Sequence, residues 1–188
     1  MILLVVGLIL FLGIHSVSIV AESRRDARVA AMGVGAWKGL YSVVSLVGLA
    51  LVVAGYAEAR TAPVWVWTPP VFTRHITLLL MVPVFPLLLS AYLPGRISAA
   101  TKHPMLLATK IWAFSHLLAN GALHDLVLFV GFLAWAVADR ISLKRRGPNV
   151  PTSGSAANDA IAVVAGLGLY AVTLLWLHRI LIGVAPVG

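Results

Sequence analysis

The stretch "HPMLLATKIWAFSHLLANG" (residues 103–121) decides the fold class. Most of its residues are apolar enough to lie in a membrane, yet it also carries a lysine, an asparagine and two histidines. One of these histidines, His116, lies well inside the segment. The stretch therefore predicts a membrane helix that holds an imidazole away from water.

The composition of the whole chain also indicates a membrane protein. Of the 188 residues, 61% are hydrophobic and 11% are charged, and the mean hydropathy is +0.99, whereas soluble domains are about half apolar and a quarter charged. The chain has no cysteine, which excludes disulfides, thiolate ligands and iron–sulfur clusters. The formal net charge of +8 comes from short basic clusters between apolar runs. This pattern is typical of membrane loops, so we expect the partner to be a lipid bilayer and not nucleic acid.

Six apolar runs are long enough to cross the roughly 30 Å of hydrocarbon in a bilayer. They predict an all-α, polytopic membrane helical bundle of about six transmembrane helices, forming a single domain over residues 1–188. The first run lacks a basic n-region and a cleavage site, so we expect it to be a mature helix and not a signal peptide. Pro83 and Pro86 predict a kink in the third run. The runs are 2–22, 37–57, 74–93, 104–120, 123–140 and 158–183.

The distribution of basic residues predicts the orientation of these six helices. With the N-terminus outside, the first, third and fifth loops and the adjoining helix ends hold eleven of the 14 lysines and arginines. This positive-inside bias predicts that both termini are non-cytoplasmic. The eleven residues are Arg24, Arg25, Arg28, Lys38, Arg96, Lys102, Lys110, Arg140, Lys144, Arg145 and Arg146; the other three are Arg60, Arg74 and Arg179.

The six carboxylates all fall at helix ends or in loops, where we expect interfacial acids. A proton-coupled transporter usually needs an acid within the membrane, and hydrolysis of many substrates needs a pair of carboxylates. Neither arrangement is visible in the sequence. The acids are Glu22, Asp26, Glu58, Asp125, Asp139 and Asp159.

Two of the six histidines are expected to lie deep in the membrane. At 1.5 Å per residue, His116 is about 18 Å from the inner end of its helix. His15 is about 13 Å from the inner end if the first helix runs on towards Arg24. The other four, at 75, 103, 124 and 178, lie near a membrane boundary.

Both deep histidines lie on helix faces that we expect to turn towards the bundle interior. Residues spaced by three and four share one face of a helix, and small or polar residues usually pack between membrane helices. Asn120 lies on the same face as His116 and is therefore a secondary candidate. The three faces are Thr109, Trp112, His116 and Asn120; Phe11, His15, Ser18 and Glu22; and Lys38, Tyr41, Ser42, Ser45 and Gly48.

Two neutral imidazoles on separate helices are a natural ligand set for haem iron. Zinc or copper would require a third or fourth ligand, and the sequence offers none at that depth. His15 and His116 are therefore the candidate axial ligands of a haem. The alternative is that each is a hydrogen-bonded packing residue.

The sequence allows two possible roles for each of five further residues. Lys38 and Lys110 would pair with haem propionates or extend to the inner membrane surface. Trp112 would stack on the macrocycle or pack against neighbouring helices. His103 precedes a proline and is read mainly as a helix start, with a regulatory or substrate role as the alternative. His178 is a candidate residue for supporting an axial ligand from behind or for an outer site.

Several segments in order along nearly the whole chain resemble the NnrU family. That family comprises bacterial integral membrane proteins linked to nitric oxide and denitrification, and it is related to the 15-cis-zeta-carotene isomerase. The resemblance implies a helical membrane fold and a b-type haem held by His15 of "GIHS" and His116 of "SHLLANG". Without the targeting extension of the plant enzymes, we expect a bacterial inner membrane. The segments are "GLILFLGIHS", "WKGLYSVVSLVGLALVVAGY", the "W.PP" turn, "HPML…W…SHLLANG" and "LHRILIGVAP".

The leading hypothesis is thus a membrane protein that binds haem b through His15 and His116. It would act in redox or nitric-oxide-linked metabolism, or in cis-trans isomerisation of a polyene such as zeta-carotene. The alternative is a cofactor-free assembly or binding protein that supports denitrification enzymes. The sequence leaves open whether the protein is an enzyme, its substrate, its redox partner and its oligomeric state.

Overall fold

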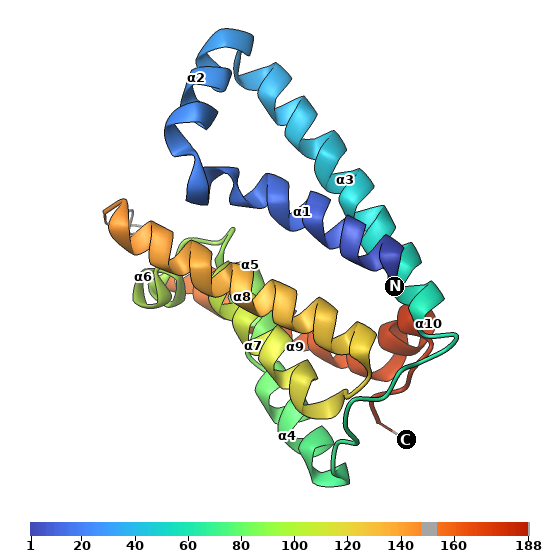
Figure 1. The fold of residues 1–188 in the computed structure, drawn as a ribbon. Coiled ribbons are helices and arrows are strands. Elements are labelled where there is room, and N and C mark those ends of the chain that lie inside the picture. The colour runs from blue at the N-terminus through green and yellow to red at the C-terminus, as the bar shows by residue number, and fades with distance from the viewer. Residues whose placement is uncertain (148–153, 188) are drawn as a thin grey trace. The chain divides into compact units, whose positions relative to one another are not determined.

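A computed structural model describes residues 1–147 and 154–187. These residues are largely helical, and their one pair of bridged extended residues is Trp65 with Ala122. The elements, drawn in Figure 1, are α1 (Ile2–Val20), α2 (Glu22–Met32), α3 (Val34–Ala59), α4 (Val71–Met81), α5 (Val84–Ser90), α6 (Arg96–Thr101), α7 (Pro104–Ala119), α8 (Leu123–Arg145), α9 (Ala156–Val172), the π-helical turn η1 (Thr173–Leu177) and α10 (His178–Ile182).

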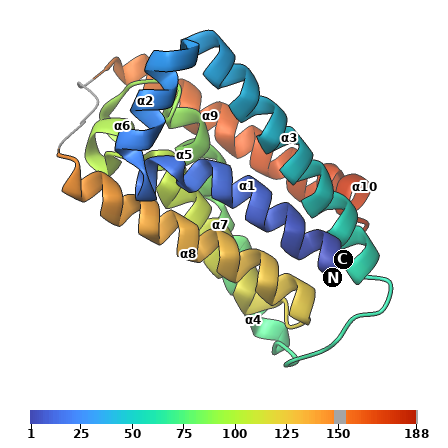
Figure 2. The same ribbon diagram turned by 45° about the horizontal axis from the view of Figure 1, so that its top comes forward.

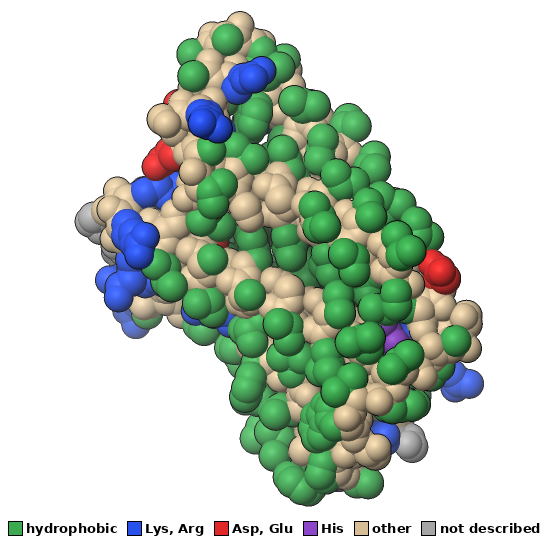
Figure 3. All heavy atoms as spheres, viewed as in Figure 1, with side chains coloured by type: hydrophobic (Ala, Val, Ile, Leu, Met, Phe, Trp, Pro, Cys, Tyr) green, Lys and Arg blue, Asp and Glu red, His purple; other side chains and the backbone are tan. Residues whose placement is uncertain are grey.

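Five helical segments are long and apolar enough to cross a membrane: residues 2–20, 34–59, 71–90, 123–145 and 156–182. Apolar side chains cover much of the molecular face drawn in Figure 3, and large hydrophobic residues on these helices are exposed. The prediction of an all-α membrane protein is therefore confirmed. The remaining predicted run forms α7, whose 16 residues extend about 24 Å, less than a full bilayer core. The count of six spans stays a prediction.

The charged segment after the first span forms a helix of its own, which the sequence analysis did not predict. The chain leaves helical geometry at Ala21 (φ −146°, ψ 48°), and α2 begins at Glu22. The charged residues of α2 include Arg25, whose guanidinium lies 3.0 Å from Asp26. Breaking the helix at Ala21 allows these charges to leave the axis of an apolar span. As a result, α1 ends at Val20 and does not run on towards Arg24.

The chain divides into two compact units, each made of two separate stretches. Unit 1 comprises Met1–Trp67 and Gly121–Arg145 and contains α1, α2, α3 and α8. Unit 2 comprises Thr68–Asn120 and Arg146–Gly188 and contains the other elements.

In unit 1, glycines allow α1 and α3 to pack backbone against backbone. The two helices are joined by α2 and run back alongside each other (Figures 1 and 2). A Cβ atom at Gly7 would come within 2.5 Å of the Val52 backbone nitrogen, and one at Gly48 would come within 2.7 Å of the Phe11 nitrogen. At Gly55, an added Cβ would overlap the backbone of Leu4. Larger residues at these positions would force the helices apart.

The tryptophan-rich loop after α3 also belongs to unit 1 and is held against the start of α8. The backbone nitrogens of Val66 and Trp67 both lie within hydrogen-bond distance of the Gly121 oxygen, at 2.9 and 3.3 Å. The Leu123 nitrogen donates to the Val64 oxygen at 2.8 Å. Between them, Ala122 is 1% exposed. This contact explains the glycine of the "ANG" sequence, because a Cβ at Gly121 would overlap the Trp67 carbonyl.

Gly121→Ala is therefore expected to destabilise the protein by about 1–3 kcal/mol, the usual range for overpacking. Thermal unfolding of the detergent-solubilised protein, followed by circular dichroism, measures the change. Gly168→Ala is the matched control, because no described atom lies within 4 Å of a Cβ built at Gly168. Equal melting temperatures for the two variants would contradict the steric explanation.

In unit 2, the predicted proline kink is confirmed as a break between two helices. α4 ends at Met81 and α5 begins at Val84, so the interruption falls at Val82 and Pro83. Nearby, Gly166 of α9 packs so closely on Pro86 that an added Cβ would lie 2.4 Å from the Pro86 nitrogen. The proline-containing segment is thus held between α9 and α7, which both pack on α5.

The first turn of α9 holds the short helix α6, another element that the sequence analysis did not predict. The Asp159 carboxylate accepts hydrogen bonds from the backbone nitrogens of Arg96 (2.8 Å) and Ile97 (3.1 Å). A carboxylate at a helix N-terminus satisfies free N–H groups and interacts favourably with the helix dipole. The side-chain amide of Asn158 also donates to the Pro94 oxygen at 2.8 Å. Asp159 is therefore a capping acid at a helix end.

Candidate functional site

His15 lies at the centre of an aromatic group in unit 1. Its ring centroid is 4.4 Å from that of Phe11 on α1, 5.1 Å from Tyr41 on α3 and 5.9 Å from Trp135 on α8. Phe132, also on α8, lies 5.8 Å from Phe11. Three helices thus build the surroundings of one imidazole, as the predicted interior faces of α1 and α3 require.

The hydrogen bond of His15 determines which ring nitrogen carries the proton. Nδ1 lies 2.6 Å from the carbonyl oxygen of Phe11, one helical turn earlier. A carbonyl oxygen only accepts, so Nδ1 must be the N–H donor. In the neutral ring, Nε2 then carries the lone pair that a metal ion or a hydrogen-bond donor can use.

His116 has the same arrangement in unit 2. Its Nδ1 lies 2.8 Å from the carbonyl oxygen of Trp112, so the same reasoning leaves the lone pair on Nε2. The Trp112 ring lies 5.5 Å from the imidazole at an interplanar angle of 51°. Asn120 donates from its side-chain amide to the His116 carbonyl at 2.8 Å. Asn120 therefore bonds to the backbone of the last turn of α7 and not to the His116 ring.

The helix ends do not reproduce the similar depths expected for the two histidines. Because α1 ends at Val20, His15 is about 8 Å from that end, and not about 13 Å. His116 is about 18 Å from the start of α7 but lies in its last turn. The two histidines are therefore alike in the hydrogen bond of the ring but not in their distance from a helix end.

His178, a secondary candidate from the sequence, lines a small pocket of unit 2 together with His116. The pocket has a volume of about 60 Å³, enough for a few water molecules and too small for a porphyrin. The π-helical turn η1, a feature often found at functional sites, directly precedes His178. The Nδ1 of His178 lies 2.7 Å from the Val184 oxygen, so its Nε2 also carries the lone pair. The lining residues are Thr77, Leu78, Met81, Phe85, His116, Tyr170, Thr173, Leu174, His178 and Pro186.

The other sequence candidates lie in different surroundings. Lys38 is exposed on α3 and Lys110 is half-buried on α7. Trp112 packs against the buried cluster formed by Val84, Leu87 and Ala108, which is the packing role considered for it. His103 stands immediately before α7, with a proline in the first turn, so its predicted position at a helix start is confirmed.

A buried polar cluster at the start of α8 was missed by the sequence analysis. His124 and Asp125 are each 5% exposed. The Tyr56 hydroxyl donates to Oδ1 of Asp125 at 2.5 Å, and Nε2 of His124 lies 3.5 Å from the same oxygen. Asp125 is at a helix end, as expected, but the end of α3 shields it from solvent. No sequence signal identified Tyr56 as its partner.

The described residues offer no cluster of side chains that could hold a metal ion by themselves. Among them, no group of three or more His, Asp or Glu side chains is placed to hold a metal ion. A haem needs only axial ligands from the protein, because the porphyrin supplies the others. His15 and His116, each with Nδ1 bonded to a backbone carbonyl, are the two imidazoles that the sequence singled out as such ligands.

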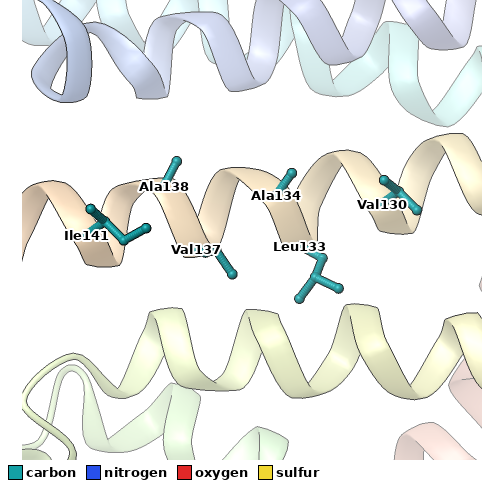
Figure 4. A pocket seen from close by; sticks show the side chains of 6 residues that line it. All are labelled: Val130, Leu133, Ala134, Val137, Ala138 and Ile141. Carbon is teal, nitrogen blue, oxygen red and sulfur yellow. The ribbon is translucent and has the colours of Figure 1, made fainter.

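Part of the surface of α8 is formed by a row of hydrocarbon side chains (Figure 4). Several of them are exposed, including Val130 (52%) and Ile141 (46%). Such a surface suits contact with lipid or another apolar molecule. The row comprises Val130, Leu133, Ala134, Val137, Ala138 and Ile141.

The chain was compared with curated proteins, with solved structures and with protein families. No curated protein and no solved structure matches the chain. The sequence profile of a family described as NnrU protein matches residues 3–186, which is nearly the whole chain. The match includes both histidines and the membrane-length helices that carry the aromatic group. The chain belongs to the NnrU family.

Proposed function

We propose that this protein binds haem b in the membrane, with Nε2 of His15 and Nε2 of His116 as the two axial ligands. The observation that carries the proposal is the Nδ1 hydrogen bond of each ring to the carbonyl four residues earlier. Such bonds fix the tautomer and orientation of a ligating histidine and raise the basicity of the other nitrogen. Both rings are therefore prepared for coordination through Nε2.

The chain's own residues would control the surroundings of the cofactor. When bound, haem supplies reversible one-electron chemistry, tuned by its axial ligands and by solvent exclusion. Phe11, Tyr41 and Trp135 surround His15 and would limit the access of water. The hydrogen bond to Phe11 would keep the His15 ring from rotating. Lys38 and Lys110 carry positive charges that would suit the haem carboxylates.

The biological role that best suits this composition is redox or nitric-oxide-linked metabolism, or haem-dependent cis-trans isomerisation of a polyene such as zeta-carotene. The apolar row on α8 supports an apolar substrate that arrives from the lipid. We place the protein in a bacterial inner membrane as a multi-pass protein with both termini non-cytoplasmic. The excess of lysine and arginine in alternate loops supports this orientation.

Visible spectroscopy of the detergent-purified protein tests the proposal. We expect a six-coordinate b-type spectrum, oxidised and dithionite-reduced, that is lost in His15→Ala and in His116→Ala because each removes one axial ligand. His75→Ala is the matched control, since His75 is exposed on α4, and it should keep the spectrum.

Two outcomes would contradict the proposal in different ways. Single variants that retain the full spectrum would show that the ligand assignment is wrong. A colourless wild-type preparation from haem-supplied cells would favour the cofactor-free assembly protein. Isomerase activity is tested separately by co-expression with a cis-carotene pathway in the dark, where an unchanged isomer ratio would exclude it.

A further inference from the structure

The charged helix α2 connects two membrane-length helices of unit 1. α1 ends at Val20 and α3 begins at Val34, and both are long and apolar enough to span a bilayer. Because α1 and α3 run back alongside each other, α2 joins their ends on one side of the membrane (Figure 1). None of its eleven residues is buried. α2 therefore lies at a membrane surface, where its side chains meet lipid headgroups.

Arg25 already pairs with both acids of α2. Its guanidinium lies 3.7 Å from Oε1 of Glu22 and 3.0 Å from Oδ1 of Asp26. Arg24 and Arg28, in contrast, are exposed and form no ion pair with a carboxylate of residues 1–147 and 154–187. Their charges are thus left to interact with solvent or with an anion from outside the described chain.

Arg24 and Arg28 lie on one face of α2. They are four residues apart, so they are neighbours on the helix surface, with Cβ atoms about 5–6 Å from each other. A helix turns by about 100° per residue, which places both acids of α2 on the opposite face. Beside the two arginines lie Ala27 and Ala31, whose small side chains leave room for a bulky anion. This face therefore presents two positive charges, with both acids turned away.

The chemistry of the two side chains and their position indicate which anion fits. A guanidinium group binds phosphate through two parallel N–H···O bonds. At a membrane surface, the abundant phosphate is that of a phospholipid. A zwitterionic lipid such as phosphatidylcholine also carries a cation, which the arginines repel, whereas an anionic lipid such as phosphatidylglycerol does not. Basic segments beside a membrane span accordingly favour anionic lipids.

We propose that Arg24 and Arg28 bind the phosphate headgroup of an anionic phospholipid in the cytoplasmic leaflet. The positive-inside bias favours the cytoplasmic side for the loop between the first two spans. The bound lipid would hold α2 against the membrane and thereby fix the adjoining ends of α1 and α3. The inference goes beyond the proposed function and does not depend on haem, because neither arginine is a candidate haem residue.

Native mass spectrometry of the detergent-purified protein tests the inference. The protein is titrated with phosphatidylglycerol or with phosphatidylcholine of the same acyl chains, and the apparent Kd of the first bound lipid is measured. We expect the wild type to bind phosphatidylglycerol more tightly. In the double variant Arg24→Gln with Arg28→Gln, the Kd for phosphatidylglycerol should rise about 25-fold, a factor of about five for each arginine near the surface. Both side chains are exposed, so we expect the fold to be unchanged.

The matched control is Arg74→Gln with Arg179→Gln, which removes two positive charges from exposed residues of unit 2. This control should keep the wild-type Kd for phosphatidylglycerol. In the wild type, added salt should weaken the binding of phosphatidylglycerol, because exposed charges are screened.

Three results would overturn the inference. The first is equal affinity of the wild type for the two lipids. The second is an unchanged affinity for phosphatidylglycerol in the Arg24 and Arg28 double variant. The third is an equal loss of affinity in the control, which would show that the net charge of the protein, and not this face of α2, selects the lipid. Each of these results leaves the haem proposal untouched.

Discussion

Replacing Gly55 by valine is expected to separate α1 from α3 and to destabilise unit 1 by roughly 3 kcal/mol or more, the upper part of the range for overpacking. A Cβ atom at this position would overlap the backbone nitrogen of Leu4. Because the obstructing atoms belong to backbone, no side-chain rotation relieves the overlap. Leu4 itself is fully buried, so a displaced α1 would also lose that packing.

The matched control lies on the same helix. Gly39→Val introduces the same side chain, yet no described atom lies within 4 Å of a Cβ built at Gly39. Size-exclusion chromatography after stepwise heating in detergent should show Gly55→Val aggregating at a temperature lower by roughly 6 °C or more. Gly39→Val should follow the wild type. If the two variants behave alike, the close α1–α3 contact is wrong.

The glycines illustrate how far the sequence alone predicts packing. Gly35 and Gly39, four residues apart, have the spacing that supports close helix contact. In the structure, no described atom lies near a Cβ at either position. Gly48 and Gly55, further along α3, make the contact with α1 instead. Spacing identifies a face that permits close approach, but which face meets a neighbour depends on the whole packing arrangement.

The spans were predictable because hydropathy and proline act locally. Long apolar runs gave membrane-length helices, and Pro83 interrupts the helix where its missing N–H and its ring require. The short helix α6 was not predictable in this way. Its N-terminus is capped by Asp159, more than sixty residues later in the chain. Elements stabilised by such distant partners leave little signal in their own sequence.

The candidate site was predictable in its residue types and less so in its geometry. Helical spacing correctly placed His15 and Tyr41 on interior faces, and the structure brings their rings within 5.1 Å of each other. Trp135 was not identified, because nothing local indicates that α8 turns this residue towards His15. The pairing of His116 with His178 in one pocket was equally invisible, since sixty-two residues separate them along the chain.

Asp125→Ala is expected to destabilise unit 1 by about 2–4 kcal/mol, through a different mechanism. Asp125 is 5% exposed, and its Oδ1 accepts a hydrogen bond from the Tyr56 hydroxyl at 2.5 Å. Removing the carboxylate leaves the buried hydroxyl without its acceptor, at about 1–3 kcal/mol, and the lost side chain adds a cavity. Nε2 of His124, 3.5 Å from the same oxygen, also loses its neighbour.

A double-mutant cycle separates the hydrogen bond from the cavity. Tyr56→Phe removes the hydroxyl, so Asp125→Ala should have a smaller effect in that background than in the wild type. Asp26→Ala is the control for loss of a carboxylate, because Asp26 pairs with Arg25 at an exposed site, where ion pairs contribute about 0–1 kcal/mol. Thermal unfolding of all four proteins in the cycle measures the coupling. Additive effects of Asp125→Ala and Tyr56→Phe would mean that the 2.5 Å contact does not stabilise the fold, and the burial of Asp125 would then need another cause.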